Sequence, residues 1–152
     1  MSTSECLRVA APRYDPTVHS QPERSLDRLL RGMSPELHPG EHVFCLVASD
    51  APIPANAIGM FLEQEAKTVI LRAEEAAALE LTPMFRAAWI TLTIHSDMAA
   101  VGFMAALSTA LAKAGISCNV VSAAYHDHLF VPYDDRERAM ETLRELQRQG
   151  NG

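Results

Sequence analysis

The sequence predicts an α+β fold, and the stretch Trp89–Tyr133 carries most of the argument. Apolar and hydroxyl side chains alternate over Ile90–Ile94, which is typical of a strand with one buried face. The small and apolar residues of Ala99–Ala114 predict a helix, and Gly115 ends it by supplying the left-handed residue past the last turn. The valine-rich segment Ile116–Tyr125 predicts a second strand. Strand, helix and strand in this order indicate helices packed on a sheet.

The N-terminal part of the chain is predicted to begin with an arm. Residues 1–24 hold three prolines among polar residues, a composition typical of an extended, mobile segment. Ser25 is placed to cap a short helix over Leu26–Met33, whose leucines follow a helical stripe. Pro35, Pro39 and Gly40 predict a loop after that helix.

Three strands and a helix are predicted next. Val43–Ala48 is a continuous apolar run of strand length, which favours a position inside a sheet. Ile58–Glu63 and Thr68–Leu71 read as the two strands of a hairpin. Glu74–Leu81 is rich in alanine and glutamate, so we expect a helix that ends before Pro83.

After the second strand of the C-terminal half, His126-Asp127 predicts a turn and His128–Val131 a short third strand. Asp134 is placed to cap a final helix. The residues of this helix that are expected to face the core are Ala139, Met140, Leu143 and Leu146.

The order of elements predicts two weak structural repeats after the arm at residues 1–24, namely an N-terminal half at 25–84 and a C-terminal half at 85–150. Each half lacks one element of a complete unit. The C-terminal half has no strand after its last helix, because residues 148–152 are too short and too polar to supply one. We therefore expect the halves to complete each other within one chain, or to complete a partner's.

Composition limits the kind of partner. The 152 residues carry 13 Lys and Arg against 19 Asp and Glu, for a formal net charge of −6, without a basic run. This balance disfavours nucleic acid or an anionic membrane as a partner. No apolar stretch reaches the roughly 20 residues that a membrane helix needs. Three cysteines without Cys-x-x-Cys spacing predict reduced thiols and a cytoplasmic location.

The C-terminal half resembles the ACT domain. Gly102 lies where an ACT domain has the glycine that opens its first helix, and Gly115-Ile116 lies at the start of the second strand, before Asn119-Val120-Val121. The longer string HSDMAAVGF…GISCNVVSAAYHDHLFVP resembles a family of small uncharacterised bacterial ACT-domain proteins. The resemblance implies ferredoxin-like βαββαβ units, here as two ACT-like halves with antiparallel sheets and helices on one face. It also implies binding of amino acids or other small effectors.

The first candidate site is the loop His95–Gly102, between a strand and a helix. A helix N-terminus presents free backbone N–H groups and can hold a carboxylate, and a glycine lets a ligand approach the backbone. The resemblance implies that this loop holds the α-carboxylate of an amino acid, with Asp97 as a partner for the ammonium group. Ser96 and Asp97 can equally serve only as helix caps. The predicted ligand-binding residues are His95, Ser96, Asp97, Met98, Ala100, Val101, Gly102, Asn119, His126 and His128.

The second candidate site is the triplet His126, Asp127 and His128. Two histidines two positions apart in a strand point the same way, and together with a carboxylate they can bind zinc or iron. A closed zinc site needs three or four convergent ligands, however, and a turn at His126-Asp127 would break the alternation. Lining a pocket or an interface is the competing interpretation.

These observations favour a non-catalytic, regulatory protein that binds a small molecule, with an amino acid as the expected effector and no cofactor. Two alternatives stay open: a structural oligomerisation module without a ligand, and a metal-dependent enzyme that uses His126, Asp127 and His128. The strand Ile116–Tyr125 and the alanine-rich helix predict a homodimer or a higher even-numbered oligomer.

Overall fold

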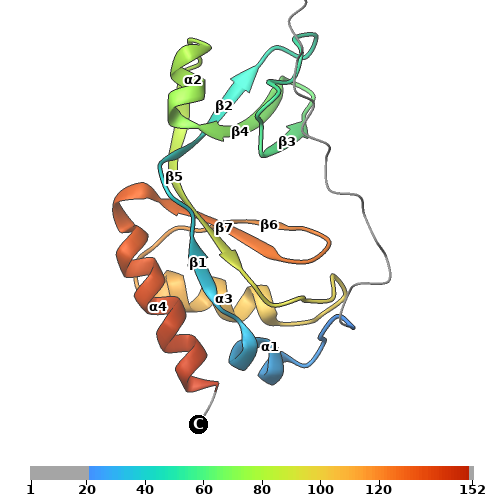
Figure 1. Cartoon of the computed structure of the whole chain (residues 1–152), viewed down its shortest axis with the longest axis vertical. Coiled ribbons are helices and arrows are strands. Elements are labelled where there is room, and N and C mark those ends of the chain that lie inside the picture. Colours follow the sequence, from blue (N-terminus) through green and yellow to red (C-terminus); the bar gives the residue numbers. More distant parts are fainter. Residues whose placement is uncertain (1–20, 151–152) are drawn as a thin grey trace, which may run out of the picture.

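The computed structural model describes residues 21–150, which form one seven-stranded antiparallel sheet with helices packed against it (Figure 1). The elements in chain order are α1 (Leu26–Gly32), β1 (Pro35–Leu37), β2 (His42–Val47), β3 (Gly59–Leu62), β4 (Lys67–Arg72), α2 (Ala73–Ala78), β5 (Pro83–Leu92), α3 (Phe103–Lys113), β6 (Asn119–Ser122), β7 (Asp127–Pro132), a 3₁₀ turn (Tyr133–Asp135) and α4 (Arg136–Gln149).

Strand β5 is the centre of the sheet, whose order is β3-β4-β2-β5-β7-β6. Its first part pairs with β2, so that Ala87 lies opposite His42. Farther along the same edge it pairs with β1, where Ile90 lies opposite Leu37. Its other edge pairs with β7 from Ala87 to Leu92. One long strand therefore serves both halves of the chain.

The pairing defines two units of the βαββαβ type that share β5, the N-terminal one without its first helix. The C-terminal unit contains β5, α3, β6, β7 and α4, and its sheet order β1-β5-β7-β6 is completed by β1 from the N-terminal half. The N-terminal unit contains β2, β3, β4 and α2, and it takes the first part of β5 as its last strand. Of the two arrangements that the sequence left open, the structure has the one in which the halves complete each other within one chain, and the ferredoxin-like fold is confirmed.

The N-terminal unit has no helix between β2 and β3. Residues 48–58 form turns there, and Pro52 and Pro54 fall in this connection. Proline removes a backbone donor and restricts the residue before it, so two prolines so close together oppose a helix.

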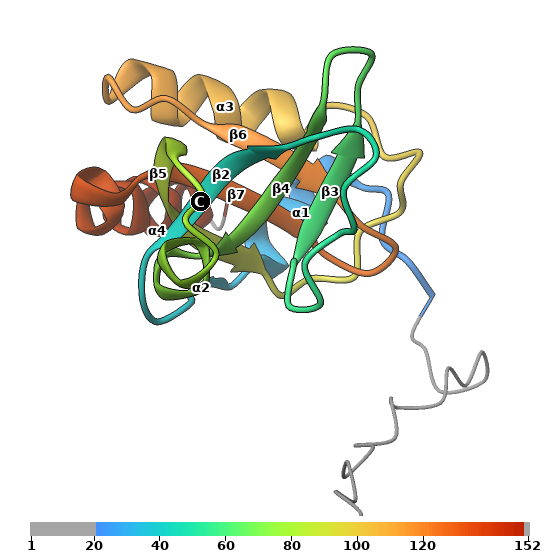
Figure 2. The same cartoon turned by 90° about the horizontal axis from the view of Figure 1, so that it is seen from above.

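Helices α1, α3 and α4 cover one face of the C-terminal sheet, with α3 and α4 packed side by side (Figures 1 and 2). The main core lies between these helices and the strands. Its largest fully buried side chains are Leu29, Met33, Ile90, Leu92, Leu107, Leu111, Leu129 and Leu143. Burial of each such side chain stabilises the fold by about 1.5–3 kcal/mol. Of the residues predicted to face inward from α4, Ala139, Met140 and Leu143 are buried and Leu146 packs at the border of this core.

A second, smaller core lies under α2 in the N-terminal unit. It contains Val43, Cys45, Val69, Leu71 and Ala76. The opposite face of the sheet carries no helix and gathers a third cluster, in which Phe44, Phe85, Trp89 and Phe130 contact one another through their rings. This helix-free face marks the junction where β5 passes from one unit to the other.

Several predicted boundaries in the C-terminal half are wrong. The predicted strand Ile116–Tyr125 is only β6, because Ile116 belongs to the cap of α3: its N–H bonds Leu111 O at 2.9 Å and its side chain is buried. Gly115, with φ +72°, ends the helix as predicted. The helix begins at Phe103 instead of Ala99, because Gly102 has φ +93° and cannot be helical.

Other differences involve strands and turns. Pro35–Leu37, predicted as loop, is β1, and β5 begins at Pro83 instead of near Ile90. The turn predicted at His126-Asp127 lies two residues earlier: Ala123 N–H bonds His126 O at 3.0 Å, and Asp127 is already in β7. The last helix starts after a 3₁₀ turn, with Asp135 at its N-cap position in place of Asp134.

Candidate functional site

A small cavity lies at the N-terminal end of α3, bounded by the loop after β5 and by the facing ends of β6 and β7. Its volume is about 110 Å³, several times the space that one water molecule needs. The residues that line it are Ser96, Asp97, Met98, Ala100, Gly102, Phe103, Met104, Ala105, Ser122 and Asp127.

Asp127 is the buried acid of this cavity, with 5% of its surface exposed. Ser96 donates a hydrogen bond to Asp127 Oδ2 at 2.7 Å, and Ser122 donates one to Oδ1 at 2.5 Å. A carboxylate offers about four acceptor positions, so each oxygen keeps capacity for a further donor. Strand alternation explains why Asp127 lies on the helix side of β7 while His128 lies on the other side.

Asp97 is held by the protein itself. Its Oδ1 accepts the Ala99 N–H at 2.8 Å, and its Oδ2 pairs with Arg24 Nε at 2.5 Å. The Ala99 N–H, together with Arg24, lowers the pKa of the Asp97 carboxyl from its ordinary value. Asp97 therefore shapes the loop and is already matched to a cation.

The segment before α1 fixes the loop from outside. Glu23 N–H bonds His95 O at 2.9 Å, and Asp97 N–H bonds Glu23 O at 3.0 Å, which together make a short parallel bridge between Glu23 and Ser96. Residues 1–20 of the predicted arm lie outside the described residues, whereas Glu23 and Arg24 hold the loop in place without lining the cavity.

The first turn of α3 supplies backbone N–H donors at the cavity. The N–H groups of Phe103, Met104 and Ala105 are among the first of the helix and have no acceptor four residues back within it. The helix dipole adds partial positive charge at this end. Gly102 precedes them with φ +93°, which favours glycine, and a Cβ there would lie a tight 3.3 Å from Leu26 Cδ2 of α1.

Half of the predicted ligand-binding residues line the cavity, namely Ser96, Asp97, Met98, Ala100 and Gly102. The other predicted residues lie elsewhere. Val101 is 85% exposed, Asn119 is exposed at the start of β6, and the His95 ring packs against Tyr125. His126 Nδ1 lies 3.2 Å from Ile94 O, and His128 Nδ1 accepts from Trp89 Nε1 on the far face of the sheet.

Sequence reasoning missed Asp127 and Ser122 as members of this site. The alternation in β7 could have revealed Asp127. Leu129 and Val131 are fully buried, and Asp127 lies two positions before Leu129, so it shares their face of the strand. The prediction of a turn at Asp127 hid that pattern.

The proposed metal triplet does not converge. Asp127 and His128 lie on opposite faces of β7, and His126 precedes the strand and contacts the backbone. Within residues 21–150, no three His, Cys, Asp or Glu side chains come together as metal ligands.

A larger groove of about 760 Å³ runs between α3 and α4 on the outer surface. It is lined mainly by small residues such as Ala106 and Ala110, and none of its lining residues is buried. Its polar lining residues, such as Lys113 and Glu145, are exposed, and none is a buried carboxylate like Asp127 in the smaller cavity.

Comparison with known families explains the architecture. An ACT-domain model matches residues 21–88, and a second ACT-domain model matches residues 85–145. The chain belongs to the ACT-domain family. The resemblance noted in the sequence is confirmed over both halves, and the two ACT matches meet in β5, the strand that both units share. ACT domains are regulatory, non-catalytic modules.

Solved structures agree with this assignment. A protein of unknown function from Vibrio cholerae, described as a possible transport protein, is 40% identical, with a TM-score of 0.71 over 81% of this ACT protein and 96% of that chain. The regulatory subunits of aspartate kinase from Thermus flavus and Thermus thermophilus share the fold at TM-scores of 0.54 and 0.55, with 15% and 12% identity. Each match covers 76% of this chain, and 96% and 98% of the respective subunit.

No functionally curated protein matches the chain. In the part of the chain that the structure describes, no helix is long and apolar enough to cross a membrane.

Proposed function

We propose that this ACT protein is a non-catalytic regulatory protein that binds a small amino acid in the cavity at the N-terminus of α3. The observation that carries the proposal is the buried carboxylate of Asp127 in the same small cavity as the first turn of that helix. An amino acid carries one cationic and one anionic group, and this cavity offers a partner of opposite charge for each.

The carboxylate of the ligand accepts hydrogen bonds from the first N–H groups of α3, where the helix dipole favours negative charge. The ammonium group donates to Asp127, whose oxygens each receive only one hydroxyl from the protein. Asp127 takes the role predicted for Asp97, because Arg24 already neutralises Asp97.

The size of the cavity favours a small ligand. A volume of about 110 Å³ is below the roughly 300 Å³ of pockets for drug-sized molecules. Met98 lines the cavity with 73% of its surface exposed, so it lies at the opening, where it offers an apolar contact to a short side chain.

The comparisons support a regulatory role. Two proteins of the same fold are regulatory subunits of aspartate kinase. We propose that this chain likewise responds to its effector and passes occupancy to another protein through assembly. We also propose a cytoplasmic location, which is supported by two free cysteines, Cys45 and Cys118, within the described residues.

We propose further that two copies pair along β3, which lies at one edge of the sheet. Its residues Met60, Phe61 and Leu62 are 38%, 49% and 70% exposed. The strand holds no proline, charge or bulge that would oppose pairing with another edge. Strand β6, at the other edge, is the seam that the sequence suggested, but it is shorter than predicted and carries polar ends.

A thermal-shift screen against the twenty amino acids, followed by calorimetry, tests the proposed ligand. A ligand present at 100 times its dissociation constant adds about 2.7 kcal/mol to the stability. Asp127→Asn removes a charge-assisted bond and should weaken binding roughly 10- to 100-fold, at about 1.5–3 kcal/mol. Asp134→Asn, at an exposed position, is the matched control and should bind normally.

Two results would contradict the proposal. If none of the twenty amino acids stabilises the protein, the structural oligomerisation module becomes the better interpretation. If an amino acid binds equally well to the Asp127→Asn variant, the ligand lies elsewhere.

A further inference from the structure

We propose that the histidines around Trp89 form a proton-sensitive switch, in which neutral imidazoles hold the junction between the two ACT units closed and proton uptake opens it. The Trp89 cluster consists of His38, His42, Trp89, Thr91 and His128. It lies apart from the amino-acid cavity, on the helix-free side of the sheet, and its role does not depend on the proposed ligand.

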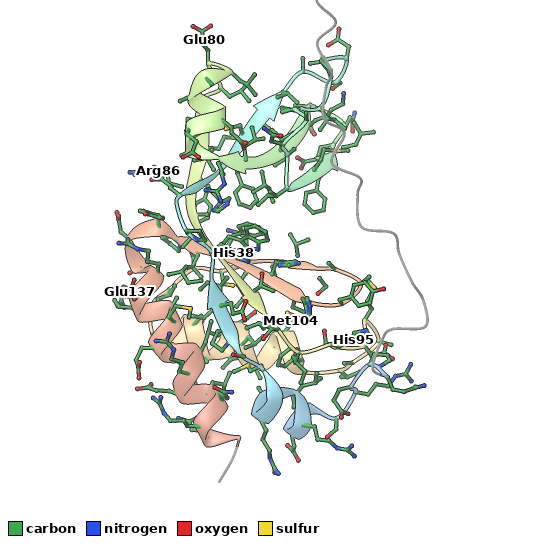
Figure 3. All side chains as sticks on the ribbon, viewed as in Figure 1. His38, Glu80, Arg86, His95, Met104 and Glu137 are labelled. Carbon is green, nitrogen blue, oxygen red and sulfur yellow. The ribbon has the colours of Figure 1, made fainter. Side chains whose placement is uncertain are left out.

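The cluster joins the elements that connect the two units. His38 lies in the connection between β1 and β2, His42 begins β2, Trp89 and Thr91 belong to β5, and His128 belongs to β7. Figure 3 places His38 at the narrow join between the upper and lower parts of the molecule. The connection is held to β5 by the His38 N–H, which bonds Trp89 O at 2.9 Å.

Ring contacts tie the connection to the indole. His38 stacks on Trp89 with ring centroids 3.6 Å apart and planes 9° apart. His42 meets the same indole edge-on, with centroids at 5.3 Å and planes at 82°. Both histidines precede or begin the strand that leads into the N-terminal unit, so their packing on Trp89 fixes where that unit starts.

The hydrogen bonds of the cluster have a direction, which the indole sets. Trp89 Nε1 can only donate, and it lies 3.1 Å from His128 Nδ1, so Nδ1 must be an acceptor. Thr91 Oγ1 lies 2.9 Å from the same nitrogen, so its hydroxyl is a second donor that shares the single lone pair of Nδ1 with the indole. The Thr91 oxygen is then free to accept the proton of His38 Nε2 at 2.7 Å. The hydrogen bonds therefore run from His38 to Thr91 and from Thr91 to His128, and Trp89 is the other donor to His128.

Protonation breaks this order at His128. A proton on Nδ1 takes away the acceptor of the Trp89 N–H and can itself be accepted only by Thr91 Oγ1, while two donors at 3.1 Å repel each other. The ring or the indole must then move. His42 resists charge for a different reason: it is 1% exposed, and its Nδ1 has no hydrogen-bond partner, so a cationic ring there would be buried without an acceptor.

The charges around the cluster favour the same neutral state. Burial lowers the pKa of His38, His42 and His128 from the ordinary value of 6.5. Nearby positive charge adds to the effect: Arg72 lowers the pKa of His38 and His42, and a proton on His38 or His126 would further lower the pKa of the histidine beside it, His42 or His128 for His38 and His128 for His126. The facing acids Glu36, Glu75 and Asp127 oppose it, one at each of the three histidines.

Opening and proton uptake are therefore coupled. When the junction loosens, each histidine regains water and its ordinary affinity for protons, so several protons bind together. An equilibrium of this kind shifts with pH more steeply than the titration of one isolated imidazole.

Trp89 reports on the switch directly, because it is the single tryptophan of the chain. We would titrate the full-length protein from pH 7.5 to pH 5.0 and record Trp89 emission, acrylamide quenching and far-UV circular dichroism. We expect emission to shift to longer wavelength and quenching to increase, with a slope above one proton, while the circular dichroism stays native.

Two variants provide the specific test. The double substitution His38→Gln and His128→Gln keeps hydrogen-bonding groups but removes two titrating rings, and it should abolish the shift. His95→Gln, the same substitution outside the cluster, should titrate as the wild type does. If the double variant does not fold, His128→Gln alone serves, since its amide oxygen can accept the Trp89 N–H, and it should reduce the slope.

Any of four results would overturn the proposal. Two concern the wild type: Trp89 emission that stays constant, or a one-proton titration without increased quenching. The other two are an unchanged shift in the histidine variants, and a shift that occurs only together with loss of the circular dichroism signal. The last result would mean global unfolding in place of a local opening.

Discussion

Ser96 donates a 2.7 Å hydrogen bond to Asp127 and so joins the loop after β5 to strand β7 inside the candidate site. Both residues are 5% exposed, although they lie 31 positions apart in the chain. With Ser122 as second donor, the carboxylate holds together the end of the hairpin β6–β7 and the loop before α3. The same contact therefore contributes both to the fold and to the proposed site.

Replacement of Asp127 should destabilise the protein. Asp127→Ala leaves the hydroxyls of Ser96 and Ser122 without their acceptor. The buried Ser96 hydroxyl costs about 1–3 kcal/mol if it stays unpaired, whereas Ser122 is exposed and its hydroxyl can bond water. Asp127→Asn retains one carbonyl acceptor and should cost less. Urea denaturation of the three proteins measures the difference in free energy of unfolding. Equal stability of wild type and Asp127→Ala would show that the two hydroxyls find other partners.

Gly102 and Gly115 offer a matched pair. Both have positive φ, +93° and +72°, so an alanine at either position costs about 1–2 kcal/mol. At Gly102 the added Cβ also meets Leu26 at 3.3 Å, whereas nothing lies within 4 Å at Gly115. We expect Gly102→Ala to be the more destabilising substitution in urea denaturation. The reverse order would argue against tight packing between α1 and the site loop.

The C-terminal ACT unit should not fold alone. A fragment of residues 83–150 lacks β1 and α1, and with them the fully buried Leu29 and Met33. Their loss removes about 1.5–3 kcal/mol of burial each from a domain whose total stability is typically about 5–15 kcal/mol. We expect no cooperative thermal transition until a peptide of residues 21–38 is added. A peptide with Leu29→Asp is the control. Cooperative folding of the fragment by itself would contradict the claim that β1 and α1 of the N-terminal half complete the C-terminal unit.

Stability should decline on acidification. Burial lowers the pKa of His38, His42 and His128, so below pH 6.5 the unfolded chain binds more protons than the folded one. The free energy of unfolding should therefore be constant above about pH 7 and fall toward pH 5. The pKa values of the Glu41 and Asp97 carboxyls are also lowered. These carboxylates stabilise the fold as long as they are ionised, so their contribution is lost only at a more acidic pH than that of the histidines.

His42→Leu tests the origin of this decline. The substitution removes a buried ring whose Nδ1 has no partner, so we expect no loss of stability at pH 7 and a weaker dependence on pH. Urea denaturation at a series of pH values gives both quantities. An unchanged slope would exclude His42 as one of the titrating groups.

Assembly should depend on the edge strand β3. Sedimentation at micromolar concentration should show a dimer for the wild type and a monomer for Phe61→Lys, because lysine on an edge opposes strand pairing. Val101→Lys changes an even more exposed apolar residue away from this edge and should leave the dimer intact. A wild-type monomer, or a dimer that Phe61→Lys leaves intact, would count against this interface.

The sequence by itself determined most helices and strands, because their signals are local. The stripe of α1, the apolar run of β2, the hairpin of β3 and β4, and the glycine that ends α3 are each defined by neighbours within a few positions. The loop before α3 was found for the same reason, and five of its residues do line the cavity.

Only the tertiary structure decided which strands meet and which polar groups are buried. Three residues, Pro35–Leu37, are too few to show a period of two, yet they complete the C-terminal sheet because β5 presents a free edge to them. Asp127 accepts a hydroxyl from the distant loop residue Ser96 as well as one from Ser122 of its own hairpin, and His128 enters another network because the next residue of a strand faces the other way. Ser96, Thr91 and Trp89 come from other parts of the chain, so no local pattern contains these partners.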